Sequence, residues 1–432
     1  MTCSNPSPPK SPTRTIPPSR ERELSADLYR VFAVVVVVAG HWLAASITYR
    51  NGRFGDDAVL AGLPPARWLT LFFQVIPILF LVAGYACAAS LTRWGGGWRP
   101  WLRRRALGVF GPATLYVAVV TAGVAAAAVS HVDARQLAYG AGAVSLHLWF
   151  LPLYLILVAL SPLLLAAQRR WGLAVPGALA AAVVVAAMIP AVAPANFVFG
   201  WAAVYQCGIA WFTGELRGRR AWWLAAAGVL ALTGLLASGR YPLSMVGVPG
   251  QAVRNTSPPT PALLAFGLAQ AGLLVGAAPA VTAWLRRSRI RGGLARLNTL
   301  AMALYLWHMV PVVLVAPVVY PSGLFPQPPL GSAFWWWTRL AWLAILAVVM
   351  AILLVPLGLL RPHLARWRGF PLPVEETRLT PVLLAGVALA VGALLVLAIR
   401  GFAPGGALPL ATLGLYFAGV ALTALHGRVL LR

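Results

Sequence analysis

The chain has 432 residues, of which 60% are hydrophobic and only 10% charged, and its mean hydropathy is +0.80. Soluble domains carry about 25% charged residues, so this composition excludes a soluble protein and indicates an integral membrane protein. The net charge of +25 comes from arginines clustered between apolar runs, without a recognisable nucleic-acid-binding module, so we exclude nucleic acid as a partner. The three cysteines have neither pairing nor metal-ligand spacing, which predicts no disulfide framework and no metal site.

The N-terminal part combines a polar tail with an unusual first apolar segment. Residues 1–23 are rich in proline, serine and basic residues, which predicts a disordered cytoplasmic tail. The segment that follows carries Asp27 and Arg30 near its start and His41 further on. On a helix, Arg30 and His41 share one face and lie ~16 Å apart along the axis. Ionisable groups inside a bilayer usually face a cavity or a partner, so this face predicts a functional site.

Apolar runs long enough to cross a bilayer recur along the chain, and the length accommodates about twelve of ~20 residues each. They lie at 28–49, 68–91, 105–129, 146–167, 173–193, 196–216, 221–238, 261–283, 298–319, 334–359, 378–399 and 407–427. With a cytoplasmic N-terminus, this alternation places most of the 34 Lys and Arg residues on the cytoplasmic side, as the positive-inside rule requires. We therefore predict an all-α polytopic membrane protein with about twelve transmembrane helices and both termini in the cytoplasm.

Two proline-rich connections stand out on the predicted outer side, at 239–260 and 320–333. Long loops of this kind more often cap a cavity or meet a substrate than span a membrane. We therefore expect them to contribute to acceptor choice.

Few polar side chains within the predicted spans suit catalysis. His41 is the strongest candidate, because a neutral imidazole takes a proton from a hydroxyl near pH 7; the alternative is a histidine that only packs against a neighbouring helix. His308 lies midway along the ninth predicted span with Tyr305 one turn earlier on the same face, and either takes part in catalysis or lines a cavity. His147, beside Trp149 at an outer helix end, is assigned to the aromatic belt.

Five short segments, in chain order, resemble the integral membrane acyltransferase 3 family. They are Arg30-x10-His41, Ile76–Tyr85, Trp101–Arg105 followed by Pro112, Leu148–Leu151 and Tyr305–His308. The match covers residues 24–320. Each segment alone is short, but five in order on a matching topology are specific.

The resemblance implies a reaction and roles for the first helix. The family transfers an acyl group, often acetyl, from a cytoplasmic acyl-CoA to a hydroxyl, and the acceptor here would be a glycan, a lipid-linked sugar or a secondary metabolite at the bacterial plasma membrane. His41 would activate the acceptor hydroxyl or briefly carry the acyl group, with His308 as a further catalytic residue. Arg30 would orient the donor or stabilise developing oxyanion charge.

The resemblance also assigns the arginines before the third span. Arg103, Arg104 and Arg105 would meet the phosphates of coenzyme A, which suit guanidinium forks; the alternative is positive-inside anchoring. Two positions depart from the family pattern. Gly108 stands where a second arginine is usual, which leaves that role to another arginine of the segment. Ala83 stands where a serine is usual, which indicates that no serine nucleophile is needed there.

The family commonly has ten helices. We therefore predict a catalytic core over residues 24–370 and a structural two-helix extension over residues 371–432. The competing hypothesis is a transporter or flippase in which the intramembrane arginine and histidine bind substrate or relay protons. It predicts inverted repeats and paired broken helices, and neither is visible in the sequence.

Overall fold

The computed structural model describes residues 23–366 and 369–428, which fold mainly into helices. The first helices are α1 (Leu24–Ala44), α2 (Val59–Gly62), α3 (Thr70–Phe73), α4 (Ile76–Arg93), α5 (Trp98–Val129), α6 (Ala134–Ala143), α7 (Phe150–Trp171), α8 (Ala174–Met188) and α9 (Asn196–Thr213). The later helices are α10 (Arg219–Ala237), α11 (Pro261–Arg287), α12 (Arg291–Trp307), α13 (Val310–Val319), α14 (Ala333–Arg366), α15 (Thr380–Arg400) and α16 (Leu410–Ala424). Residues 1–22 of the predicted tail lie outside the described residues.

Short strands and 3-10 turns join these helices. The strands are β1 (Ile47–Arg50), β2 (Arg53–Asp56), β3 (Phe370–Glu375) and β4 (Leu425–Arg428). The 3-10 turns are η1 (Pro64–Leu69), η2 (Leu146–Trp149), η3 (Ala193–Ala195), η4 (Glu376–Leu379) and η5 (Pro404–Gly406). β1 and β2 form an antiparallel hairpin that turns at Asn51 and Gly52, both with positive φ, as the Asn-Gly pair favours.

The helices confirm a multi-pass membrane protein. By length and composition, eight of the described helical segments can cross a membrane, and α12 with α13, bent by 54° at a short break, makes a ninth. The remaining predicted spans, at 173–193, 196–216 and 407–427, fold as α8, α9 and α16. Helices α8 and α16 have only 15 residues each, about 22 Å against a ~30 Å hydrocarbon core. The count of twelve therefore stays a prediction.

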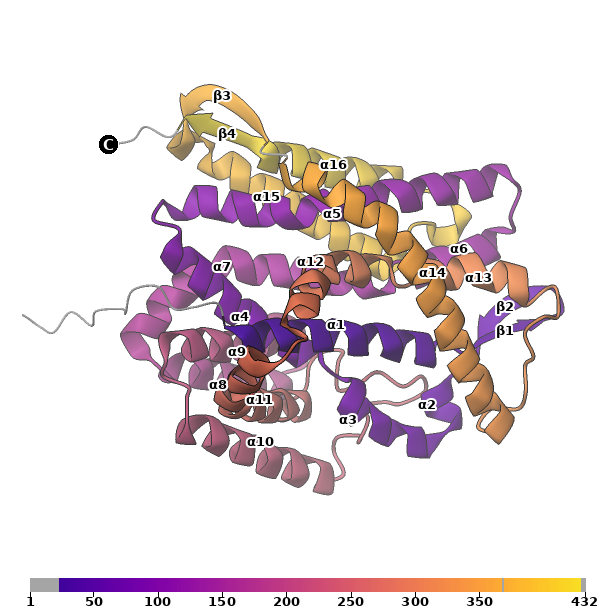
Figure 1. Cartoon of the computed structure of the whole chain (residues 1–432), viewed down its shortest axis with the longest axis horizontal. Helices are drawn as coiled ribbons and strands as arrows, with labels where there is room; N and C mark the ends of the chain where they lie inside the picture. The colour runs from indigo at the N-terminus through magenta and orange to yellow at the C-terminus, as the bar shows by residue number, and fades with distance from the viewer. Residues whose placement is uncertain (1–22, 367–368, 429–432) are drawn as a thin grey trace, which may run out of the picture.

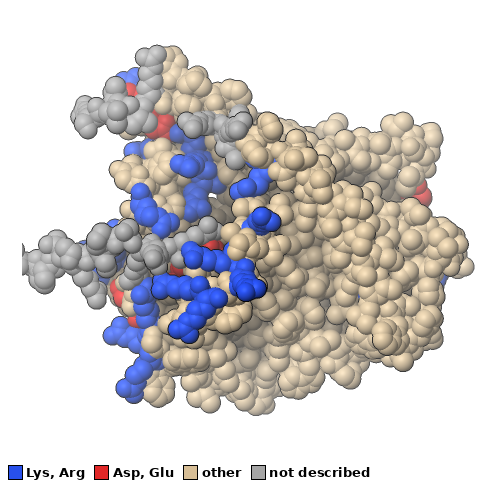
Figure 2. All heavy atoms as spheres, in the orientation of Figure 1, with Lys and Arg blue, Asp and Glu red and all other residues tan. Residues whose placement is uncertain are grey.

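The charge of the molecule is gathered at one end. Helices α1, α5, α7 and α15 lie lengthwise, and α14 crosses them obliquely (Figure 1). On the face shown in Figure 2, the Lys and Arg side chains gather at the end where α1 begins and where α4 connects to α5. The positive-inside rule predicts that this end faces the cytoplasm.

Glycines allow α4 and α9 to pack backbone against backbone. A Cβ atom on Gly84 would lie 1.9 Å from the carbonyl oxygen of Tyr205, and one on Gly208 would lie 1.9 Å from that of Leu81. Small residues permit such contact between membrane helices. The glycine that helped to identify the family resemblance is therefore a packing residue of this helix pair.

The C-terminal segment is built onto the same bundle. Helix α15 packs against α16, α7 and η2, and β3 pairs in parallel with β4 (Figure 1). The structural role of this extension stays a prediction, but two of its polar side chains reach the core. Glu376 and His426 line a cavity shared with the core, as described below.

Candidate active site

Two histidine side chains from different helices meet inside the bundle. His41 lies in the last turn of α1, and His308 lies in the break between α12 and α13. His41 Nδ1 is 3.2 Å from His308 Nε2, and the ring centroids are 5.1 Å apart. His308 is fully buried and His41 half-buried. The tertiary structure thus brings together two residues that the sequence analysis predicted only as separate catalytic candidates.

The hydrogen bonds of this pair define which nitrogen atoms carry hydrogen. His308 Nδ1 lies 2.7 Å from the carbonyl oxygen of Tyr305, which can only accept, so Nδ1 carries the hydrogen. Nε2 of a neutral His308 is then an acceptor, and His41 Nδ1 donates to it. His41 consequently keeps its lone pair on Nε2, where a base or nucleophile needs it.

The break in the ninth span holds His308 against α1. Pro311 at the start of α13 has no backbone N–H to donate, so α12 cannot continue as a regular helix. Within the break, the carbonyl oxygen of His308 accepts a hydrogen bond of 2.6 Å from the indole Nε1 of Trp42. Because an unpaired carbonyl is costly inside a membrane, this bond stabilises the break beside His41.

His147 is a member of the same cluster, and its assignment to an aromatic belt was wrong. It is 1% exposed, and its ring centroid is 4.7 Å from that of His308. The Nε2 atom of His147 donates to the carbonyl oxygen of Leu306 at 2.9 Å, and the backbone carbonyl oxygen of His147 accepts a hydrogen bond from the Tyr305 hydroxyl. The ring is enclosed by Tyr116 of α5 and by Tyr305 and His308, more than a hundred and fifty residues later in the chain.

An arginine-lined cavity of about 1080 Å³ lies between α1, α5, α12 and α14. Small-molecule sites usually occupy ~300–1,000 Å³, so the space suits a large ligand. One carboxylate, that of Glu376, and five guanidinium groups line it: Arg30, Arg103, Arg104, Arg105 and Arg361. An adjoining cavity of about 580 Å³ shares Arg104, Arg105 and Gly108 with the first.

The three consecutive arginines differ in their surroundings. Arg103 is buried in an ion pair with Glu376, and its Nε donates to the carbonyl oxygen of Thr423 at 3.2 Å. Arg104 lies over the ring of Trp94 at 5.2 Å, and Arg105 donates to a backbone carbonyl of α4 at 3.1 Å. Among the described residues neither Arg104 nor Arg105 forms a salt bridge, so both keep an uncompensated charge.

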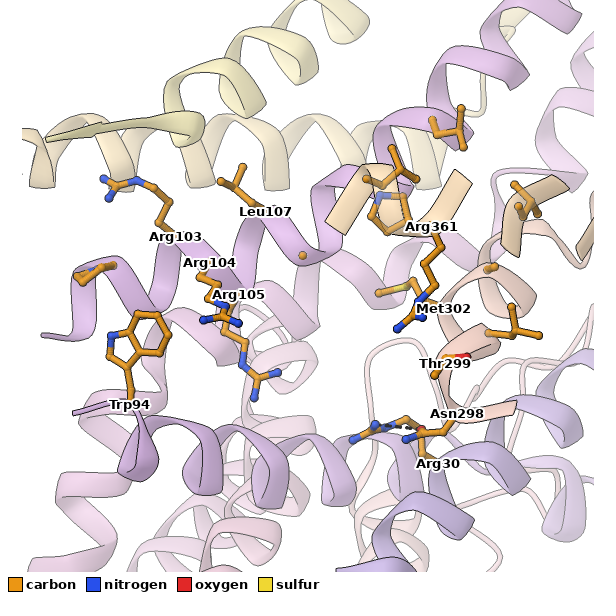
Figure 3. Close-up of a pocket in the computed structure, with 18 of the residues that line it drawn as sticks. Arg30, Trp94, Arg103, Arg104, Arg105, Leu107, Asn298, Thr299, Met302 and Arg361 are labelled. Atoms are coloured by element: carbon orange, nitrogen blue, oxygen red, sulfur yellow. Dashed lines mark hydrogen bonds between the residues drawn. The ribbon is translucent and has the colours of Figure 1, made fainter. Parts of the chain in front are cut away.

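Figure 3 shows how these side chains are directed. Arg104 and Arg105 extend from α5 into the space that Arg30 and Arg361 enter from the opposite side. Arg103 points away from them toward the C-terminal segment. The geometry therefore suits Arg104 and Arg105 to an anionic ligand, whereas the charge of Arg103 is already neutralised.

Arg30 connects the cavity to the helix that carries His41. Its guanidinium donates to Asn298 Oδ1 at 3.1 Å, and Asn298 Nδ2 donates to Asp27 at 2.8 Å. Asn298, a residue that the sequence analysis missed, thus fixes the arginine on the cavity wall. Trp307, which directly precedes His308, also lines the cavity.

The molecule is thus a polytopic membrane protein with an arginine-lined cavity and a buried cluster of histidines. A model of an acyltransferase domain family matches residues 23–361. The chain therefore belongs to the acyltransferase 3 family, as its motifs predicted. It matches no curated protein and no solved structure.

Among the described residues, no group of three or more His, Cys, Asp and Glu side chains is placed to hold a metal ion. The prediction that the reaction needs no metal stays a prediction.

Proposed function

We propose that this protein transfers an acyl group, acetyl in the simplest case, from cytoplasmic acyl-CoA to a hydroxyl group. The acceptor would be a glycan, a lipid-linked sugar or a secondary metabolite at the bacterial plasma membrane. The observation that carries the proposal is the hydrogen bond between His41 and His308, which leaves the free electron pair of His41 on Nε2. His41 lies on α1, the helix that also contributes Arg30 to the arginine-lined cavity.

The arginine-lined cavity would hold the donor as substrate. Coenzyme A carries a diphosphate and a further phosphate on its ribose, and guanidinium forks bind such groups bidentately. Arg104 and Arg105 would bind phosphate, and Arg30 would orient the donor at the wall that leads to the histidines. Arg30 lies ~16 Å from His41 along α1, which is too far for it to act on the oxyanion but within reach of a pantetheine arm.

His41 would supply the proton transfer. As the acceptor oxygen attacks the thioester carbon, its hydroxyl proton passes to His41 Nε2, and the Nδ1–H bond to His308 stabilises the resulting imidazolium. Collapse of the tetrahedral intermediate breaks the C–S bond, and the proton on Nε2 passes to the departing thiolate. The products are the ester and free coenzyme A.

The same lone pair allows a second course in which His41 attacks the thioester itself. The Nε2–acyl bond would form as the C–S bond breaks, giving an acyl-imidazolium and coenzyme A thiolate. In a second step the acceptor oxygen would take the acyl group, and the hydroxyl proton released to Nε2 balances the proton that the thiolate takes up. Incubating the protein with acyl-CoA that is labelled on the acyl group, without acceptor, distinguishes the two mechanisms, because only the covalent mechanism leaves label on His41.

The test uses the purified full chain in liposomes with radiolabelled acetyl-CoA and a crude glycan extract. We expect wild-type protein to consume the label, His41→Ala to lose turnover, and His363→Ala to match the wild type. His363 is an exposed histidine that lines neither cavity, and it serves as the control. Equal turnover by His41→Ala would refute the mechanism.

The transporter hypothesis remains the competing function. It predicts two broken helices related by an inverted repeat, whereas the described residues contain one bent pair that qualifies as a span, α12 with α13. If the liposomes never consume acetyl-CoA while a substrate crosses the membrane, the transporter hypothesis replaces this one.

A further inference from the structure

Arg361 is a cavity arginine without an assigned role. It lies near the end of α14, and its side chain lines the larger cavity. In Figure 3 its guanidinium points inward, toward Met302 and the side of the cavity occupied by Arg30. No hydrogen bond or ion pair joins the Arg361 side chain to another described residue. Arg361 is an exposed residue, so solvent or a ligand in the cavity is left to meet its charge.

The α5 wall of the cavity has an open position at Gly108. Gly108 of α5 lines both cavities, one turn beyond Arg104 and Arg105. A Cβ atom built on Gly108 would meet nothing within 4 Å, so the space in front of it is open. Arg103, the other cation of this wall, is neutralised by Glu376. The α5 wall thus presents fewer free guanidinium groups than its sequence of arginines suggests.

We propose that Arg361 binds a phosphate of the acyl-CoA donor and supplies from α14 the guanidinium that α5 lacks at Gly108. The proposal rests on the proposed function, since it names a further binding residue for the same donor. Arg104 and Arg105 on one wall and Arg361 on the other form a cradle that grips phosphate from two sides. Guanidinium forks on opposite walls fix both the position and the orientation of such a ligand.

The alternative role for Arg361 is anchoring at the membrane boundary by the positive-inside rule. An anchor only needs a cation near the interface, and its loss leaves donor binding intact. A phosphate ligand loses one charge-assisted hydrogen-bond pair when Arg361 is replaced, which corresponds to roughly 10- to 100-fold in affinity. The two roles therefore separate in a binding measurement.

The experiment measures binding of radiolabelled coenzyme A to the purified full chain, alongside KM and kcat for acetyl-CoA in liposomes. We expect Arg361→Gln to raise Kd and KM roughly 10- to 100-fold with little change in kcat. Arg296→Gln, which removes an exposed arginine of α12 that lines neither cavity, is the control and should bind as the wild type does.

Restoration sharpens the test. An arginine at 108 would enter the open space shared by the two cavities, so the double variant Gly108→Arg/Arg361→Gln should recover most of the affinity lost in Arg361→Gln. If Arg361→Gln binds coenzyme A like the wild type, or if the double variant recovers nothing, the proposal is wrong. If the wild type neither binds coenzyme A nor consumes acetyl-CoA, the proposed function itself fails.

Discussion

The arginine-lined cavity and the His41–His308 pair differ in how far their polar groups are already satisfied. Three of the four ring nitrogens in the pair are hydrogen-bonded, and the backbone of His308 is held by Trp42. In the cavity, by contrast, the Arg361 guanidinium has no partner among the described residues, and Arg104 meets only an aromatic face. The cavity therefore keeps guanidinium groups that an anionic ligand could pair with, whereas most ring nitrogens of the His41–His308 pair are already hydrogen-bonded.

The largest expected effect on turnover comes from a substitution in the His41–His308 pair. Replacing His308 by Leu removes one hydrogen-bond acceptor of His41 Nδ1–H, so the imidazolium loses that stabilising contact. General-base catalysis contributes about 10²–10⁴-fold, and we expect a loss of turnover in that range. Affinity for coenzyme A should stay within a few-fold, because His308 does not line the arginine cavity.

His308→Gln is the informative companion variant. The Gln amide oxygen can accept the hydrogen bond from His41 Nδ1, so turnover should lie well above that of His308→Leu. Single-turnover rates measured after mixing each variant with acetyl-CoA give this comparison. Equal rates for the two variants would mean that His308 only fills space.

A second substitution affects stability at the border between core and extension. Glu376→Gln leaves the buried Arg103 guanidinium without its ion partner, which costs about 3–5 kcal/mol of unfolding free energy. The double variant Arg103→Met/Glu376→Leu removes both charges and should lose much less. Thermal unfolding in detergent measures both. A double variant less stable than Glu376→Gln would contradict the ion-pair explanation.

Local sequence predicted some residues of the histidine cluster and of the cavity, whereas long-range packing determined which other residues they contact. Arg30 and His41 share a face because of helical periodicity, which can be predicted from their spacing of eleven positions. The contact of His41 with His308, and the burial of His147 against Tyr305 and His308, depend on segments far apart in the chain. Trp149 beside His147 suggested a membrane boundary because local sequence does not record what covers it.

The cavity was predicted in the same partial way. Three adjacent arginines marked one wall, but the sequence did not show that Arg103 forms an ion pair with Glu376 and so has its charge neutralised. Asn298 and Arg361 reach the cavity from α12 and α14, and neither lies in a motif that points to a ligand. Only the crossing of those helices places them opposite Arg105.

A third substitution tests the scaffold on which both regions depend. Gly84→Ala drives a methyl group into the backbone of α9, where its Cβ would lie 1.9 Å from the carbonyl oxygen of Tyr205. Overpacking of this kind costs about 1–3 kcal/mol. Gly123→Ala in α5, where a Cβ meets nothing within 4 Å, is the matched control and should be neutral. Equal melting temperatures for both variants would contradict the close approach of α4 and α9.

The smallest expected effect separates the two regions by salt. Raising ionic strength from about 0.1 M to about 1 M shortens the Debye length from about 10 Å to about 3 Å, which weakens attraction between exposed charges far more than hydrogen bonds between buried groups. We expect KM for acetyl-CoA to rise several-fold, because its phosphates meet guanidinium groups in a hydrated cavity, while kcat holds steady because His308 is fully buried. Steady-state kinetics in liposomes over this range measure both constants. A falling kcat at constant KM would reverse the assignment, since the salt-sensitive charges would then act at the reacting atoms rather than on the donor phosphates.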